Sequence, residues 1–178
     1  MSMANWKRIL RQLRVESDGI IPAATEAHLK QYEANYGRLS NSYKSYCRVF
    51  GPGIVGGVFR IAAPGYDGSI STFSPDGLRD AVINGTNYKR SAGDGVERVE
   101  RGLFFCIDSD RAYYFFDPED VPYKRPYECA VYRLAFDYSV HRLADSYWQF
   151  FIAYCIGNKF AQLFPGSDME LTFVPAAG

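Results

Sequence analysis

Residues 25–57 constrain the fold of this chain more than any other segment, because they contain two short helices with clear start and stop signals. Thr25 is a favourable N-cap, and Gly37 is suited to the left-handed conformation that ends many helices. Ser40 can cap the second helix, where apolar residues recur at helical spacing up to Phe50. The segment therefore predicts a helical hairpin that packs on another part of the protein.

The glycine-rich residues 51–57 follow this hairpin. They resemble a phosphate-binding loop only superficially, because no lysine followed by serine or threonine comes after them and a helix precedes them. We interpret the segment as a turn. An apolar stripe that begins at Trp6 predicts an earlier helix, which ends near Ser17-Asp18-Gly19.

The sequence of the rest of the chain predicts a sheet with further helices. Residues 103–107 and 112–116 predict a β-hairpin, with more strands at 129–134 and 140–143. Weaker strand signals lie at 58–61, at 70–73 and, as a terminal edge strand, at 169–174. A helix begins at Pro75, residues 86–102 predict a long loop or a weak edge strand, and Asp145 or Ser146 can cap a strongly apolar last helix.

These elements predict an α+β fold in a single domain over residues 1–178. An antiparallel sheet of about four to six strands carries the N-terminal helices and the C-terminal helix. The composition is that of an ordinary globular protein, with 47% hydrophobic and 22% charged residues.

Charge and cysteine content argue against some classes of function. Twenty basic and twenty acidic residues give no net charge, so no global field favours nucleic acid. No secretion signal or membrane span is evident, which predicts a cytoplasmic protein without a membrane partner. The four cysteines form no C-x-x-C pair and lie in apolar segments. We expect buried, reduced thiols, no metal site and no cofactor.

Several of these motifs together resemble the SUKH superfamily, whose members carry a glutamate shortly before a glycine, a leucine-led turn, a tyrosine-containing helix and a glycine-rich loop. The matching residues are Glu33, Gly37, Leu39, Tyr43 and Gly56-Gly57. The resemblance extends over residues 6–155, although Ser40 stands where the family usually has proline. For Glu33, which lies beside Tyr32 and Tyr36, the residues favour a structural hydrogen bond to backbone amides or a tyrosine hydroxyl.

The SUKH resemblance implies a bacterial immunity protein that binds a secreted polymorphic toxin, often a nuclease or deaminase, and occludes its active site. A regulatory adaptor related to fungal regulators of cell-wall assembly is the alternative. A third hypothesis is a small hydrolase that uses Cys47 or Cys106 with His141. The residues favour a binding module over an enzyme, because no acid, base and nucleophile stand together in the sequence.

The predicted hairpin at 103–116 is apolar on both faces. Either helices cover both faces, or one face is free for a protein partner; the sequence does not specify the oligomeric state. We predict the second arrangement, with aromatic residues at the centre of the contact and an acidic rim that suits a basic toxin. The predicted contact residues are Tyr113, Phe115, Asp108, Asp110, Asp117, Glu119 and Asp120.

Overall fold

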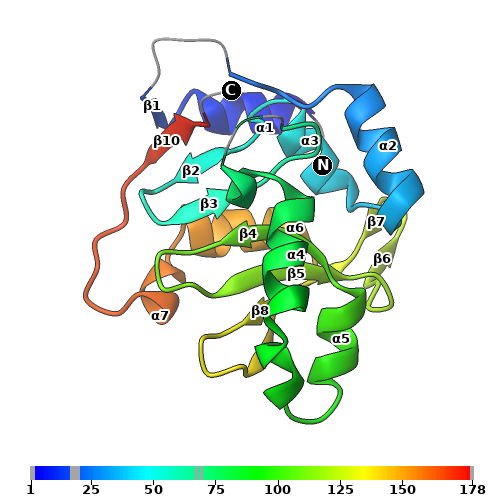
Figure 1. Ribbon diagram of the computed structural model, residues 1–178. Helices are drawn as coiled ribbons and strands as arrows, with labels where there is room; N and C mark the ends of the chain where they lie inside the picture. The colour runs from blue at the N-terminus through cyan, green and yellow to red at the C-terminus, as the bar shows by residue number, and fades with distance from the viewer. Residues whose placement is uncertain (1–2, 17–20, 67, 69, 177–178) are drawn as a thin grey trace.

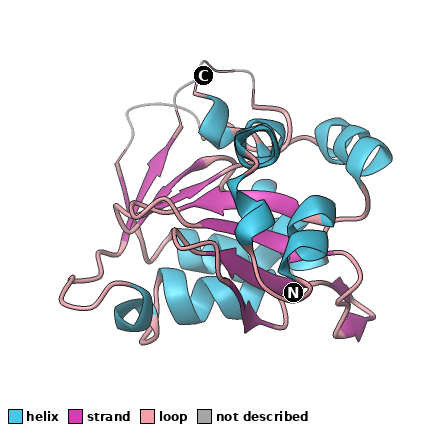
Figure 2. Ribbon diagram, turned by 60° about the horizontal axis from the view of Figure 1, so that its bottom comes forward, coloured by secondary structure: helices cyan, strands magenta, loops and turns pink. Residues whose placement is uncertain are grey.

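The computed structural model describes residues 3–16, 21–66, 68 and 70–176. It shows an α+β single body in which helices lie on both sides of one sheet (Figures 1 and 2). The predicted fold class is confirmed. The sheet is larger than expected, with eight strands, and it is mixed because one pair of strands is parallel.

The sheet brings together segments from the whole chain. Its parallel pair is β1 with β10, and every other neighbouring pair is antiparallel. In spatial order the strands are β1 (Arg14–Val15), β10 (Thr172–Pro175), β2 (Gly53–Val55), β3 (Phe59–Ile61), β4 (Leu103–Ile107), β5 (Tyr113–Asp117), β8 (Ala130–Leu134) and β9 (Val140–Ala144). A separate small hairpin consists of β6 (Tyr123–Lys124) and β7 (Tyr127–Glu128).

The helices divide between the two faces of this sheet. The first group, on the far side in Figure 1, contains α1 (Met3–Leu10), α3 (Asn41–Cys47) and α6 (Tyr147–Phe150), and α6 continues as the π-helical turn η3 (Phe151–Cys155). The near side carries α4 (Pro75–Gly85) and α5 (Gly95–Arg101). The remaining elements are α2 (Glu26–Tyr36), α7 (Phe160–Leu163) and the 3-10 turns η1 (Ser71–Phe73) and η2 (Asn87–Arg90).

Aromatic side chains fill the far-side core. The Trp6 ring meets Tyr46 and Phe151 edge to face, at centroid distances of 5.4 and 5.1 Å. Tyr43 is buried from α3, and its hydroxyl donates a 2.7 Å hydrogen bond to the carbonyl of Ala62. The helical hairpin is thus anchored to the sheet through its tyrosines.

Several local predictions are confirmed. The hydroxyl of Thr25 caps α2 by accepting a hydrogen bond from the amide of His28 at 3.2 Å, and Ser146 caps α6 in the same way through Gln149. The strands at the centre of the sheet and the helix at Pro75 also lie where the sequence places them. The last helix is central to the core, as its apolar surface predicts.

Other predictions are wrong. Ser71 to Phe73 form the 3-10 turn η1, where the sequence predicts a strand over residues 70–73. Residues 51–57, which we interpret from sequence as a turn, include the strand β2. The last strand is internal, since β10 lies between β1 and β2. Ser40 makes no cap hydrogen bond, because its hydroxyl accepts from the amide of Cys129 at 2.9 Å.

The N-terminal helix is shorter than predicted. It ends at Leu10, and the chain has already entered β1 at Arg14. The expected stop at Ser17, Asp18 and Gly19 lies outside the described residues. The largest error concerns residues 86–102, which form η2 and α5 instead of a loop or an edge strand.

Candidate partner-binding groove

The SUKH-like signature residue Glu33 links the helices α2 and α3. The Glu33 carboxylate accepts a 2.9 Å hydrogen bond from the amide of Leu39 and pairs with the Lys44 ammonium at 2.8 Å. Gly37 has a φ of 117°, which favours glycine between the helices. The predicted structural role of Glu33 is confirmed, with a lysine as an additional partner.

The centre of the predicted contact face is not accessible. Phe115 is completely buried, because α4 and α5 cover this face with Leu78, Val82 and Val99. Tyr113 on the same strand is only half-buried. The prediction that Phe115 contacts a partner is therefore wrong, whereas Tyr113 remains available.

The predicted acidic rim is divided between the two ends of β5. At the far end, the Asp117 side chain has no exposed surface and bonds to Arg98 at 2.5 Å and to Arg101 at 2.7 Å. Asp120 pairs with Arg142 at 2.8 Å, and Glu119 with Arg101 at 3.2 Å. Asp117 and Asp120 are therefore paired within the protein, and the buried Asp117 cannot join the acidic rim that the sequence predicts. The Glu119 side chain is 71% exposed, so its place in the rim stays a prediction.

The environment of Asp117 keeps its carboxylate ionised. Burial acts to raise its pKa, but the hydrogen bonds from Arg101 and from the amide of Glu119, together with the charge of Arg98, lower the pKa below its usual value. The ionised side chain thus links α5 to β5. Its role in this structure is to fix the helix that buries Phe115.

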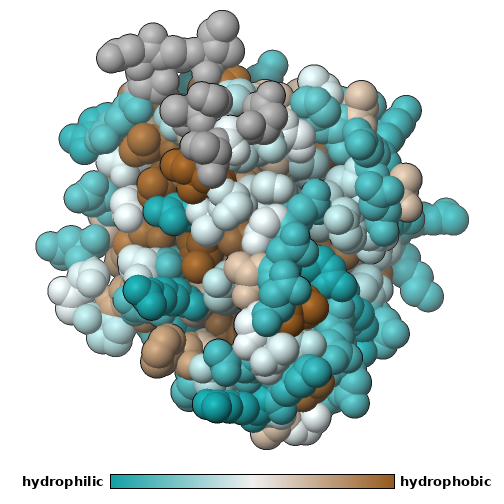
Figure 3. Space-filling model, viewed as in Figure 1, coloured by the Kyte–Doolittle hydropathy of each residue, from teal (hydrophilic) through white to brown (hydrophobic). Residues whose placement is uncertain are grey.

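The other end of β5 is open. The cross-strand register places Ile54, Arg60, Ile107 and Tyr113 next to one another on the near face, and Val174 continues the row onto β10. All five side chains are half-buried. Figure 3 shows apolar side chains gathered over β10, β2 and β3, to the left of α4. Among the described elements, no α-helix lies over this part of the sheet face (Figure 1), and only the short 3-10 turn η1 contacts its β3 edge.

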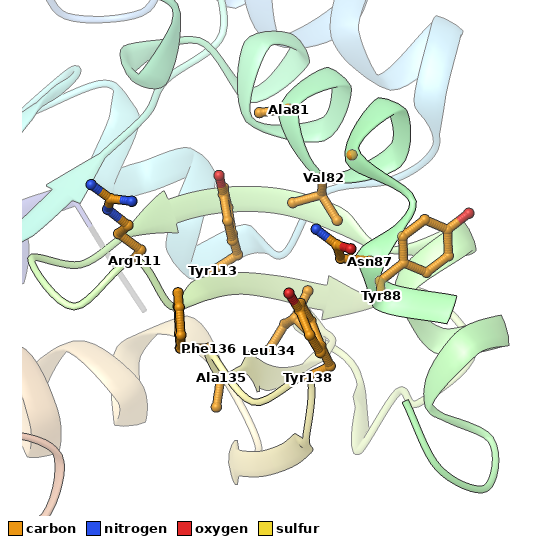
Figure 4. Close-up of a pocket in the computed structure, with 11 residues that line it drawn as sticks. Ala81, Val82, Asn87, Tyr88, Arg111, Tyr113, Leu134, Ala135, Phe136 and Tyr138 are labelled. Carbon is orange, nitrogen blue, oxygen red and sulfur yellow. The ribbon is translucent and has the colours of Figure 1, made fainter. Parts of the chain in front are cut away.

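Two adjoining hollows lie on this side of the sheet, one along the row and one beyond Tyr113. The first, of about 420 Å³, lies over Ile54, Val58, Arg60 and Ile107. The second, of about 190 Å³, is shown in Figure 4 and lies between α4 and the turn that joins β8 to β9. Both hollows are also lined by Arg111 and Tyr113, and together we call them the groove.

Aromatic side chains surround the second hollow. Tyr138 and Phe136 extend from the β8–β9 turn, opposite Val82 on α4, and Tyr113 stands at one end (Figure 4). Phe136 is 70% exposed, the most exposed of the large apolar side chains on the described surface. Exposed aromatic residues around a hollow are typical of binding hot spots.

The backbone around this hollow is strained. Among the described residues, the non-glycine residues with positive φ are Thr86, Arg111 and Tyr138, at 57°, 63° and 67°. Arg111 and Tyr138 line the hollow, and Thr86 lies between two residues that line it. Such a conformation costs about 1–2 kcal/mol for a residue with a side chain. Strain of this kind concentrates at functional sites.

Two hairpin turns of the same design present these side chains. In each, a residue in the left-handed conformation donates its amide to the carbonyl three positions earlier: Arg111 to Asp108 at 3.1 Å and Tyr138 to Ala135 at 2.9 Å. Glycine or asparagine is the less strained choice for that position. The bulky side chains are therefore not required by the turns themselves.

Asp108 shapes the first turn from inside. One carboxylate oxygen accepts from the amides of Asp110 and Ala112, both at 2.9 Å, and the other accepts from the Tyr114 hydroxyl at 2.7 Å. Its side chain has no exposed surface, and burial raises its pKa. Asp108 thus positions Arg111 and cannot contact a partner as predicted, whereas Asp110 is exposed at the tip of the turn.

The accessible charge in the groove is positive. Among the residues that the structure describes, those that carry charge and line the groove are Arg60, Arg111 and the buried Asp108. Arg60 donates to the Thr72 hydroxyl at 3.2 Å and lies over the Phe73 ring. Within the described part of the chain, neither Arg60 nor Arg111 has a carboxylate partner.

The thiols lack the environment of a nucleophile. Cys47 and Cys106 are completely buried, and burial raises the pKa of both. His141 is exposed on β9, where its Nε2 lies 2.7 Å from the Ser139 hydroxyl. An activated thiolate needs a lowered pKa, so this arrangement does not favour the hydrolase hypothesis.

Within the described ranges, no group of three histidine, cysteine, aspartate or glutamate side chains could hold a metal ion. No helix among those residues has the length and apolar character needed to cross a bilayer.

Comparison with known proteins adds no relatives: no family model, curated protein or solved structure matches this chain. The SUKH assignment therefore remains a prediction from motifs.

Sequence reasoning missed the cover over Phe115 and the groove beside it. A signal for α5 exists, since Val96 and Val99 are three positions apart and Asp94 precedes Arg98 by four. The groove has no comparable signal, because its residues come from distant strands.

Proposed function

We propose that this protein is a non-enzymatic binding module whose groove is the contact surface for a protein partner. One observation carries the proposal: on a sheet face without an α-helix over it, the groove combines half-buried apolar residues with two arginines that have no carboxylate partner among the described residues. Apolar and aromatic groups together with arginine are enriched in the cores of protein interfaces.

The SUKH resemblance supplies the class of partner. On that basis the protein is a cytoplasmic immunity protein that neutralises a secreted toxin domain of the nuclease or deaminase class by binding it. The contact differs from the one that the sequence predicts, because Phe115 is buried and because Asp117 and Asp120 are paired with arginines. Aromatic burial around Tyr113 supplies most of the expected affinity.

The test uses toxin domains encoded beside the gene. Each purified domain is titrated calorimetrically with the wild-type protein and with Tyr113→Ala. We expect the variant to bind about 30-fold more weakly, which corresponds to about 2 kcal/mol. Tyr123→Ala is the matched control, because Tyr123 is an exposed tyrosine on β6 and does not line the groove.

The proposal fails if Tyr113→Ala binds like the wild type, or if no adjacent toxin domain binds. Growth of cells that express the toxin domain gives a second readout. Co-expression of the wild-type protein should restore growth, and co-expression of Tyr113→Ala should restore it less well at equal protein levels.

A further inference from the structure

From the charge and shape of the groove, we infer that it binds an acidic segment of the partner that carries an aromatic side chain. The ring enters the hollow in Figure 4, and a neighbouring carboxylate pairs with Arg111. This inference rests on the proposed function, since it specifies the chemistry of the partner at the same surface.

Charge complementarity is the first argument. Arg60 and Arg111 lie among apolar residues, and the one acidic residue among the described ones that line the groove, Asp108, is buried and bonded to Tyr114 and to backbone amides. An arginine presents a planar fork that matches a carboxylate in geometry and charge. A basic segment would instead meet two unpaired arginines.

Room for a ring is the second argument. The hollow has a volume of about 190 Å³ and is lined by Val82, Leu134, Tyr113 and Tyr138. An apolar cavity of about 150 Å³ can hold a benzene ring. The surrounding tyrosine rings offer the offset or edge-to-face contacts that aromatic pairs prefer.

Backbone strain is the third argument. Arg111 and Tyr138 occupy turn positions where glycine would avoid the left-handed penalty, yet both place large side chains at the hollow. The turns do not need these side chains, and no carboxylate in the described chain uses Arg111. The Tyr138 ring packs against the near-side core and lies 5.6 Å from the Arg90 guanidinium, so the fold already uses this side chain. A contact with a partner accounts for Arg111.

The experiment needs no knowledge of the partner. Amide chemical shifts of the full chain are followed by NMR during titration with phenylpropionate, phenylpropanol or phenylpropylammonium, which share a ring and differ in charge. Concentrations reach about 10 mM, because ligands of this size bind in the millimolar range. We expect shifts at Arg111, Tyr113, Leu134 and Tyr138 with phenylpropionate, and about tenfold weaker binding of the neutral alcohol.

Variants assign the effect to residues. Arg111→Gly should fold, because glycine suits the φ of 63°, and it should lose the preference for the carboxylate over the alcohol. Lys124→Ala also removes one positive charge, but on β6 outside the groove, and should bind like the wild type. Added salt should weaken the binding of phenylpropionate and leave that of phenylpropanol unchanged.

The inference is overturned if none of the three compounds shifts these amides, if the ammonium compound binds as well as the carboxylate, or if Arg111→Gly keeps the preference. These outcomes are distinct from failure of the proposed function. If Tyr113→Ala abolishes toxin binding but phenylpropionate does not bind, the groove is a contact surface with other chemistry. If phenylpropionate binds but Tyr113→Ala leaves toxin binding intact, the groove has the inferred chemistry and the proposed function is wrong.

Discussion

The two ends of β5 place arginines in contrasting surroundings. At the Asp117 end, Arg98 and Arg101 both bond to a fully buried carboxylate and hold α5 against the sheet. At the Tyr113 end, Arg60 and Arg111 have no carboxylate partner in the described chain, and none of its α-helices lies over the sheet face beside them. The first end uses its charges to complete the fold. The second leaves charge and apolar surface available for a partner.

Two aspartates near β5 have similar positions in the sequence but different surroundings in the fold. Asp117 is the last residue of β5 and Asp110 shortly precedes its first, but Asp117 is buried in an arginine cluster and Asp110 is exposed at the tip of a turn. Position in the sequence does not distinguish them. The two aspartates differ because α5 lies over the Asp117 end of β5 and not over the other end.

The largest effect is expected from removal of the buried carboxylate. Asp117→Ala leaves Arg98 and Arg101 without their shared partner and should lower the free energy of unfolding by about 3–5 kcal/mol. Urea denaturation at neutral pH measures this change. The matched variant Asp110→Ala at the open end should stay within about 0.5 kcal/mol of the wild type. Equal effects of the two variants would contradict the contrast between the ends.

A smaller effect is expected at the turn of the open end. Asp108→Ala leaves the Tyr114 hydroxyl and two backbone amides without their acceptor, which should lower the free energy of unfolding by about 1–3 kcal/mol. Binding at the groove should also weaken, because the turn no longer fixes Arg111. A variant that keeps full stability would show that the carboxylate does not organise the turn.

The pH dependence should differ in sign between the ends. The pKa of Asp117 is lowered in the folded state, so its contribution to stability is present above the unfolded value of about 3.9 and is lost as the pH falls through the folded pKa. The pKa of Asp108 is raised, mainly by burial, so its ionisation opposes folding and this penalty is relieved as the pH falls through the folded pKa toward the unfolded value. Each group changes the slope by at most about 1.4 kcal/mol per pH unit.

Urea midpoints between neutral pH and about pH 3 test these signs. Asp117→Asn should flatten the loss of stability below about pH 4. Asp108→Asn should remove the gain in stability that this carboxylate gives the wild type as the pH falls from neutral toward about pH 4. Identical pH profiles for the two variants would mean that the two carboxylates do not differ in the way the structure indicates.

Part of this structure could be predicted from sequence. The helix at 26–36 has a strong N-cap and a glycine stop, and β4 and β5 are dense in aromatic residues, so local signals suffice. The helix α5 has only Val96 and Val99 as apolar residues. Its ion pairs with Asp117 join positions 16 and 19 residues apart, which local patterns do not reveal.

The groove could not be predicted for the same reason. Its row of half-buried residues is created by the register of five strands, and one of them, β10, comes from the end of the chain. The aromatic pattern alone predicts Tyr113 as a contact residue, but its half-buried position is visible only in the folded sheet. The strained turns at Arg111 and Tyr138 are likewise visible only in the backbone.

The most direct test of this account compares stability and binding in Arg111→Gly. Glycine relieves a left-handed penalty of about 1–2 kcal/mol and adds about 0.5–1 kcal/mol of chain entropy to the unfolded state. Urea denaturation should therefore show stability that is unchanged or higher by about 1 kcal/mol, while the same sample binds phenylpropionate about tenfold more weakly. Lower stability with unchanged binding would show that Arg111 serves the fold, and would contradict the claim that the open end of β5 is kept for a partner.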